Sequence, residues 1–326
     1  NSFRFASGRY TGKNFNEMFA QLGFTHLIFN IDVSDNFVHR VSLYDTAQCP
    51  ENLLAQLFIR RETTFSVLNT KSFDTKAAGV PEYYARGFEE GLSYLRGYFY
   101  GSNMVESRNN GTLPWCRERR IGENPHLLQM IAIEWLRFQN PKKSWGTMVP
   151  LPGQFHPGLG SVDDMQMLLQ QLCEKRDRDG VLNIPEHWHN AYVYSRMRWS
   201  YHFLNPAFEG FFQSTRIALG KDLKERGLAM VAWAVNLGLL RCRVPQEMVS
   251  KGVDPATTFA IKWVGQEQVT AAKPKLLEYF SSPGYKDMVQ KFTRPELFYI
   301  DWSAATLLPT TINMPFQIED LTRKTS

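Results

Sequence analysis

The stretch that decides the fold spans residues 145–201 and reads WGTMVPLP (145–152), GQFHPGLG (153–160), SVDDMQMLLQQLCEKRDRDG (161–180), VLNIP (181–185), EHWHNAYVYSRM (186–197) and RWSY (198–201). Val162, Met165 and Leu169 recur at helical spacing and predict an amphipathic helix. The Asp-Gly pair at 179–180 ends this helix, and a short apolar run follows it. The stretch therefore predicts the order strand, glycine turn, helix, strand, short helix, strand.

The glycine turn before the predicted helix is a candidate anion site. Its glycines let the backbone adopt a positive φ and let a ligand approach closely. Ser161 is expected to cap the helix with its side chain. The first N–H groups of a helix have no partner inside the helix and, together with the helix dipole, favour an anion. A tight turn with a purely structural role is the alternative. The candidate binding residues are Gln154, Gly158, Leu159, Gly160, Ser161 and Val162.

This order of elements resembles the acetyl-CoA-binding half of the acyl-CoA N-acyltransferase (GNAT) family. In that family a Q/R-x-x-G-x-G/A turn holds the CoA pyrophosphate, and the matching turn here, Gln154–Gly160 (QFHPGLG), is one residue longer. The second helix carries Asn190–Tyr194 where the family has an N-x-x-A-x-x-x-Y-like pattern, and Arg198-Trp199 stands where it has Gly-Phe. The resemblance extends over about residues 124–204.

The resemblance implies a fold, a cofactor and a catalytic residue. The implied fold class is α/β (α+β), a GNAT-like mixed sheet flanked by helices. The implied cofactor is CoA or an acyl-CoA, held by the glycine turn. Tyr194 matches the position where the family often places the acid that protonates the leaving thiolate. The alternative is that Tyr194 only packs on its helix face.

Three departures from the family argue against catalysis. The family's fourth strand donates backbone N–H groups toward the pantetheine arm, but Pro150 and Pro152 have none. The extra residue crowds the turn. No carboxylate lies in Trp145–Leu151, where a base often sits, and Glu134 and Glu186 are the nearest in sequence.

Composition narrows the class of protein. The chain has 326 residues, 43% of them apolar and 21% charged, which is typical of a folded protein. The net charge of +5 is not concentrated in one run, and no specific nucleic-acid motif is present. No apolar window is long enough for a transmembrane segment. The four cysteines lie far apart, which disfavours zinc and disulfides.

No metal site is predicted from the histidines. His187 and His189 stand at i and i+2 near the start of the predicted short helix, and such positions do not share a helix face. We therefore expect each of them to be a satisfied or solvent-facing histidine.

The first residues, NSFRFASGRYTGK, are basic, hydroxylated and free of acids. This composition is found at and just after organelle transit peptides, and it predicts a mitochondrial location on the matrix side. The alternative is that the chain was simply trimmed at this point.

The rest of the chain divides into four parts. Residues 1–123 contain a predicted hairpin (His26–Val33 with Phe37–Tyr44) and a helix from Pro81 that are expected to join the core sheet. Residues 124–204 form the GNAT-like core and begin with a predicted buried helix, His126–Phe138. Residues 205–292 form a helical C-terminal extension, and residues 293–326 form an extended, aromatic terminal arm.

Two functions follow from these patterns. The first is a non-catalytic GNAT-like structural or accessory subunit of a large organellar complex, such as a respiratory, ATP synthase or ribosomal assembly. Its aromatic-rich termini would bind other subunits by protein–protein interaction. The alternative is a CoA-dependent N-acyltransferase that acts on an amine or a protein acceptor, with Tyr194 as the acid.

Overall fold

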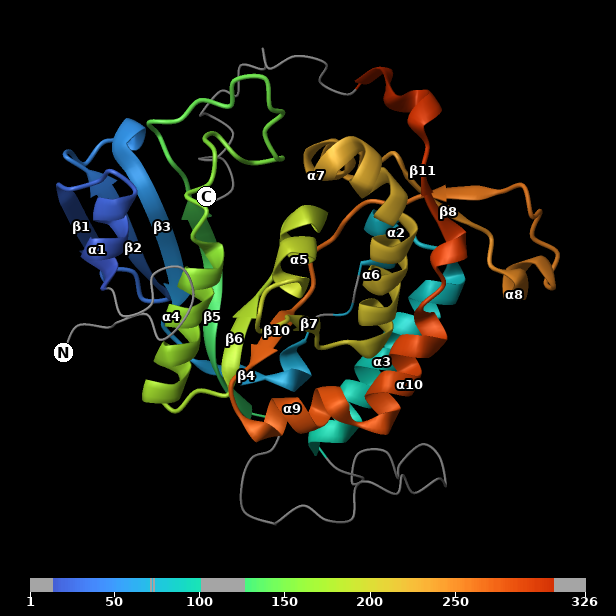
Figure 1. Cartoon of the computed structure of the whole chain (residues 1–326). Helices are drawn as coiled ribbons and strands as arrows, with labels where there is room; N and C mark the ends of the chain where they lie inside the picture. The colour runs from blue at the N-terminus through green and yellow to red at the C-terminus, as the bar shows by residue number, and fades with distance from the viewer. Residues whose placement is uncertain (1–13, 71, 73, 101–126, 308–326) are drawn as a thin grey trace.

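The computed structural model describes residues 14–70, 72, 74–100 and 127–307. The chain has a mixed α/β fold in which helices cover both faces of a mostly antiparallel sheet (Figure 1). Among the described strands, only β5 and β6 pair in parallel, and a short strand, β4 (Thr64–Ser66), pairs with β5 outside the main order. In spatial order the strands are β1 (Leu27–Asp32), β2 (Val38–Asp45), β3 (Leu53–Arg60), β5 (Leu127–Phe138), β6 (Gly180–Asn183), β10 (Gln268–Ala271) and β7 (His202–Phe203).

Two groups of helices bury the two faces of this sheet. On one face α1 (Phe15–Gln21) and α4 (Val162–Lys175) pack on β2, β3, β5 and β6. On the other face α3 (Glu82–Tyr100), α9 (Pro274–Ser281) and α10 (Pro283–Phe292) pack on β5, β6 and β10. The central strands are therefore covered on both sides.

The predicted helix His126–Phe138 is wrong, because Leu127–Phe138 is the strand β5. Met130 and Ala132 face α3, while Ile131 and Ile133 face α4. A strand buried on both faces is apolar at every position, and such a run cannot be distinguished from a buried helix by periodicity alone.

The predicted strand Trp145–Leu151 is also wrong, because residues 139–160 form an irregular connection between β5 and α4. Pro150 and Pro152 cannot donate to a sheet, which excludes a central strand here. Side chains hold the connection instead: the Trp233 indole N–H donates to the Pro150 carbonyl at 2.7 Å, and the Trp145 indole donates to the Phe155 carbonyl at 3.1 Å.

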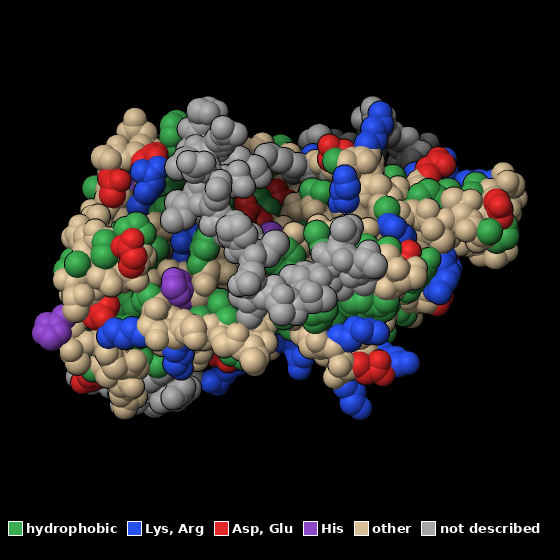
Figure 2. Space-filling model, turned by 90° about the horizontal axis from the view of Figure 1, so that it is seen from above, with side chains coloured by type: hydrophobic (Ala, Val, Ile, Leu, Met, Phe, Trp, Pro, Cys, Tyr) green, Lys and Arg blue, Asp and Glu red, His purple; other side chains and the backbone are tan. Residues whose placement is uncertain are grey.

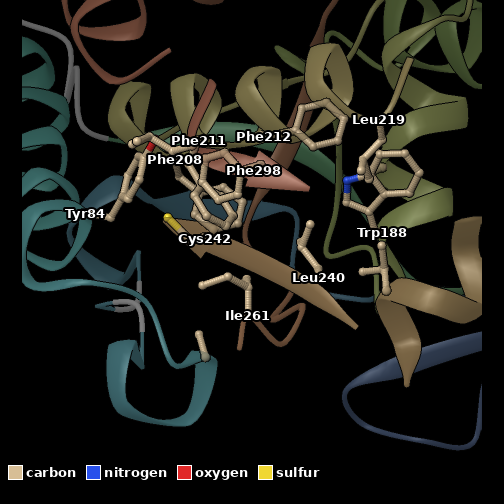
Figure 3. Close-up of a cluster of buried hydrophobic side chains, with 14 of the residues drawn as sticks. Tyr84, Trp188, Phe208, Phe211, Phe212, Leu219, Leu240, Cys242, Ile261 and Phe298 are labelled. Atoms are coloured by element: carbon tan, nitrogen blue, oxygen red, sulfur yellow. The ribbon is translucent and has the colours of Figure 1, made fainter. Parts of the chain in front are cut away.

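A second core lies beside the sheet and is built mainly from helices. Phe208, Phe211 and Phe212 of α6 meet Trp188 and Tyr84 there (Figure 3). Its elements are α2 (Thr75–Ala78), α5 (Trp188–Ser195), α6 (Pro206–Ala218) and α7 (Gly220–Asn236, kinked at Gly227), with a small sheet of β11 (Phe298–Ile300), β8 (Leu240–Arg243) and β9 (Thr258–Ala260). A short helix, α8 (Gln246–Val249), follows β8, and none of its four residues is buried.

The predicted C-terminal arm begins as part of this core. Residues 298–300 pair with β8, and Leu297, Phe298 and Ile300 are buried. Residues 308–326 lie outside the described residues. The other short elements are 3₁₀ turns at Pro50–Asn52, Val67–Asn69, Pro295–Leu297 and Trp302–Leu307.

The backbone of α3 packs closely against its neighbours at two of its glycines. A Cβ atom on Gly87 would lie 2.2 Å from the Phe292 ring, and one on Gly91 would lie 2.0 Å from Asn205 Oδ1. Asn205 caps α6 and also donates to the Phe88 carbonyl.

Among the described residues, none of the helices combines the length and apolar character that a membrane crossing requires.

Candidate functional site

A wedge opens between the two parallel strands at their carboxyl ends. The strands pair from Met130 opposite Gly180 to Ile133 opposite Asn183. The next residue of β5, Glu134, is an extra residue relative to the neighbouring strand β3. Phe58 of β3 pairs with Trp135, and the residue after it, Ile59, pairs with Ile133, so Glu134 is skipped. Such a β-bulge bends its strand and re-aims side chains. Past the bulge, β5 continues to Phe138 along β3 only.

A cavity of about 420 Å³ occupies this wedge. The end of β5, the residues after β6, the 152–156 loop and one side of α5 form its walls. Near the middle of the face seen in Figure 2 there is a hollow, with acidic and histidine side chains at its bottom. The lining residues that matter most for chemistry are Glu134, Gln154, Asn183, Glu186, His189 and Tyr194.

The glycine turn lies beside the carboxyl end of β5, next to the cavity. The N–H group of Asn140 donates to the Pro157 carbonyl at 2.7 Å, and a Cβ on Gly158 would lie 3.9 Å from the Phe138 carbonyl. Gly160 has a φ of +69° and open space around it. Of the predicted binding residues, Gln154 lines the cavity, while Gly158, Leu159, Gly160, Ser161 and Val162 lie at the turn and do not line it.

The predicted side-chain cap at Ser161 is wrong. The Ser161 hydroxyl is buried and has no hydrogen-bond partner among the residues that the structure describes, and it does not cap α4. The Leu159 side chain is buried against α1 and α4, which anchors the turn, while Gly158 and Gly160 are exposed. The first N–H groups of α4 are therefore not capped by the residue expected to cap them.

Tyr194 lies on α5 and lines the cavity. Its ring is tilted against Tyr201, with 5.3 Å between the centroids. Burial raises the pKa of Tyr194 to about 12, because desolvation disfavours the phenolate. The phenol is protonated at neutral pH, as a free tyrosine is, and the raised pKa makes it a weaker acid than a free tyrosine.

Two carboxylates line the cavity, and no sequence motif had predicted either of them there. Glu134 stands at the bulge, and its carboxylate accepts a hydrogen bond of 2.6 Å from Arg60 Nε. Glu186 follows the end of β6. The sequence carried no signal for the bulge, because its cause is the pairing of β5 with β3.

His187, which precedes α5, and His189, which lies in α5, are on the same side of this helix, contrary to the prediction. Their rings stack with centroids 5.3 Å apart and an interplanar angle of 12°. Burial, and then the neighbouring His187, lower the pKa of His189 to about 3, so its imidazole is neutral. His189 is 2% exposed and its Nδ1 has no partner among the described residues. The prediction of a satisfied or solvent-facing histidine is wrong here.

Asn183, at the end of β6, also has a buried polar atom that lacks a hydrogen-bond partner among the described residues. It is 5% exposed, and its Oδ1 has no partner in the part of the chain that the structure describes. Buried polar atoms without partners cost free energy, of the order of 1–3 kcal/mol each. Both residues line the cavity, where a water molecule or a polar ligand that reached these atoms would complete their hydrogen bonding. The described residues bring together no group of three or more side chains suited to a metal.

Searches against protein-family models, curated proteins and solved structures found no match to this chain. The fold and the site therefore define its class. It is a mixed α/β protein with a ligand-sized cavity where its two parallel strands separate. Ligands commonly bind outside the carboxyl ends of parallel strands.

Proposed function

We propose that this chain is a CoA-dependent N-acyltransferase that acylates an amine in the cavity between β5 and β6. The observation that carries the proposal is the bulge at Glu134, which separates the two strands beside the glycine turn. The CoA pyrophosphate would bind the N–H groups of the turn, with Gln154 beside it. The pantetheine arm would then follow β5 into the cavity.

The departures that argued against catalysis are weaker arguments in this fold, because the strand before the turn is β5. Pro150 and Pro152 lie outside the sheet, and β5 contains no proline. Two carboxylates, Glu134 and Glu186, line the cavity. Arg137 adds positive charge to the same wall, and its guanidinium lies 5.1 Å from the centre of the Phe155 ring. These features favour an anionic cofactor and a basic acceptor.

The proposed reaction assigns a role to each reacting group. Glu134 accepts a proton from the ammonium of the acceptor, which frees its lone pair. The amine nitrogen attacks the thioester carbonyl carbon, a C–N bond forms, and the C–S bond breaks. Tyr194 donates its phenolic proton to the departing thiolate. The nitrogen, now bonded to the acyl carbon, gives its second proton to the Tyr194 phenolate, which restores the phenol, and the products are an amide and CoA.

A structural or accessory subunit of a mitochondrial complex, in the matrix, is the second candidate. The observation in its favour is the edge hairpin of the sheet, where large apolar side chains are exposed. Exposed apolar patches of this kind mark protein–protein contacts. The residues are Phe29, Ile31, Val33 and Phe37, with Phe37 78% exposed.

The decisive experiment is a calorimetric titration of the chain with acetyl-CoA and with CoA. Gly160→Glu places a carboxylate at the turn, where it repels the pyrophosphate, and it adds strain at a positive φ. Gly252→Glu is the matched control, because Gly252 also has a positive φ (+89°) with open space around it and lies after α8. We expect saturable binding in the wild type and in Gly252→Glu, and its loss in Gly160→Glu.

Two results would contradict the proposal. A folded wild-type chain that gives no heat with either ligand has no working CoA site, and the subunit function then stands. Equal binding by Gly160→Glu and the wild type would show that the turn does not hold the cofactor. The same preparation run by size exclusion separates a stable monomer from a chain that requires partners.

A further inference from the structure

A second cavity adjoins the first. Its volume is about 440 Å³, and it lies between the start of α5 and the end of α7. The two cavities share three wall residues: Glu186, His187 and Asn236. A molecule in the second cavity would therefore touch the same residues as a molecule in the first.

Opposite charges line the second cavity. Glu186 brings a carboxylate from the shared wall, and Lys262 brings an ammonium group from a different segment of the chain. Among the described residues, neither side chain forms an ion pair or a hydrogen bond that would neutralise it. One cavity thus offers both an unneutralised anion and an unneutralised cation, the pattern that complements a zwitterion.

Apart from His187 and Asn236, which also line the first cavity, much of the remaining wall is apolar. Ala232, Val235 and Leu237, from α7 and its carboxyl end, lie there, with Trp263 beside Lys262. The Trp263 indole N–H is already bonded to the Pro185 carbonyl at 2.9 Å, so the ring offers mainly its apolar surface. This wall suits an apolar side chain and gives no partner to a polar one.

We propose that this second cavity is the acceptor subsite and that it binds an α-amino acid with an apolar side chain. The proposal rests on the acyltransferase function proposed above. The α-carboxylate pairs with Lys262, the side chain lies against α7, and the α-amino group lies at Glu186. That position is the wall shared with the first cavity, so the amine faces the thioester carbonyl.

The test compares L-phenylalanine with L-phenylalaninamide, which keeps the ring and the amine but lacks the carboxylate. Calorimetric titrations with both compounds, and with L-leucine, use the wild type, Lys262→Gln and Lys224→Gln. Lys224 is an exposed lysine of α7 outside the cavity and serves as the charge control. We expect the wild type and Lys224→Gln to prefer the carboxylate by about fivefold to tenfold, which is reasonable for a partly exposed ion pair. Lys262→Gln should lose this preference.

Each outcome bears on one proposal. If acetyl-CoA binds but neither amino acid does, or if the amide binds as well as the acid, the subsite proposal is wrong and the acyltransferase proposal survives. A preference that persists in Lys262→Gln also overturns the subsite. Amino-acid binding that depends on Lys262, in a chain that does not bind CoA, supports the subsite and overturns the acyltransferase.

Discussion

Tyr194 is the proposed proton donor because of its position. Its phenol lines the cavity, and its pKa is raised to about 12 by burial. Tyr194→Phe removes only the hydroxyl, so we expect kcat to fall by at least about 10²-fold. Acetyl-CoA affinity should change by less than about twofold, because packing is kept. Steady-state CoA release and calorimetry measure the two quantities.

Tyr192→Phe is the control, because the Tyr192 hydroxyl accepts a hydrogen bond from Arg196 and Tyr192 does not line the cavity.

The raised pKa of Tyr194 also sets the pH dependence of the rate. The phenol is the protonated, active form below about 12, and its contribution is lost only as the pH rises through that value. A Tyr194-dependent loss of rate between pH 8 and 10 would contradict this assignment.

Glu209 is a buried carboxylate that stabilises the fold and takes no part in the site. Burial alone would raise its pKa, but the nearby His202 ring, the Phe203 N–H (2.8 Å) and the Gln213 amide (2.7 Å) outweigh burial, and the pKa is lowered. A lowered pKa in the folded state stabilises the protein above the unfolded pKa of about 4.3, and this contribution is lost as the pH falls.

Glu209→Gln should therefore lower the free energy of unfolding at pH 7 by about 1–3 kcal/mol, the usual cost of losing hydrogen bonds to a charged group. The difference from the wild type should shrink at pH 4. Urea unfolding at both pH values measures it, with the exposed Glu225→Gln as control. An equal difference at both pH values would show that the Glu209 charge is not responsible.

At the scale of the element, the bulge in β5 lies beside the cavity, at the point where the pairing of β5 with β6 ends, and we propose that it keeps the cavity open. Deleting Glu134 removes the extra residue and leaves Ile133 and Trp135 paired with consecutive residues of β3. The strand loses its local bend, so we expect a folded chain that no longer binds acetyl-CoA. Glu134→Ala keeps the bulge and removes only the carboxylate, and it should bind acetyl-CoA but lose turnover. Calorimetry and circular dichroism distinguish the two variants, and acetyl-CoA binding by the deletion variant would contradict the role of the bulge.

The helix α4 could be predicted from the sequence, and the strand β5 could not. Met165, Leu169 and Cys173 recur at helical spacing in α4, so its period is visible in the chain although residues 164–173 are all buried or half-buried. Strand β5 lies under helices on both faces and carries no such period. Pro150 and Pro152 already argued against the strand that was predicted over residues 145–152.

At the scale of the whole molecule, the C-terminal segment closes the helical core. Phe298 is 4% exposed, and its ring lies 5.4 Å from Phe211 and 5.6 Å from Tyr84. Phe298→Ala should lower the free energy of unfolding by about 3–5 kcal/mol, as expected for a large buried aromatic. Tyr299→Ala, whose ring lies under Arg243, should cost about 1 kcal/mol or less. Equal costs, measured by urea unfolding, would show that the segment does not belong to the core.

The sequence by itself determined the class of fold, the helix α4, the strand β6 and the position of Tyr194 on α5, because each depends on residues close together in the chain. Only the tertiary structure decided the site. The cavity depends on β5 pairing with β3 on one side and β6 on the other, and Glu134, Asn183 and His189 meet there from three separate elements. Contacts between segments far apart in sequence leave no local pattern, which is why the proposed chemistry depends on the pairing of strands that no motif specifies.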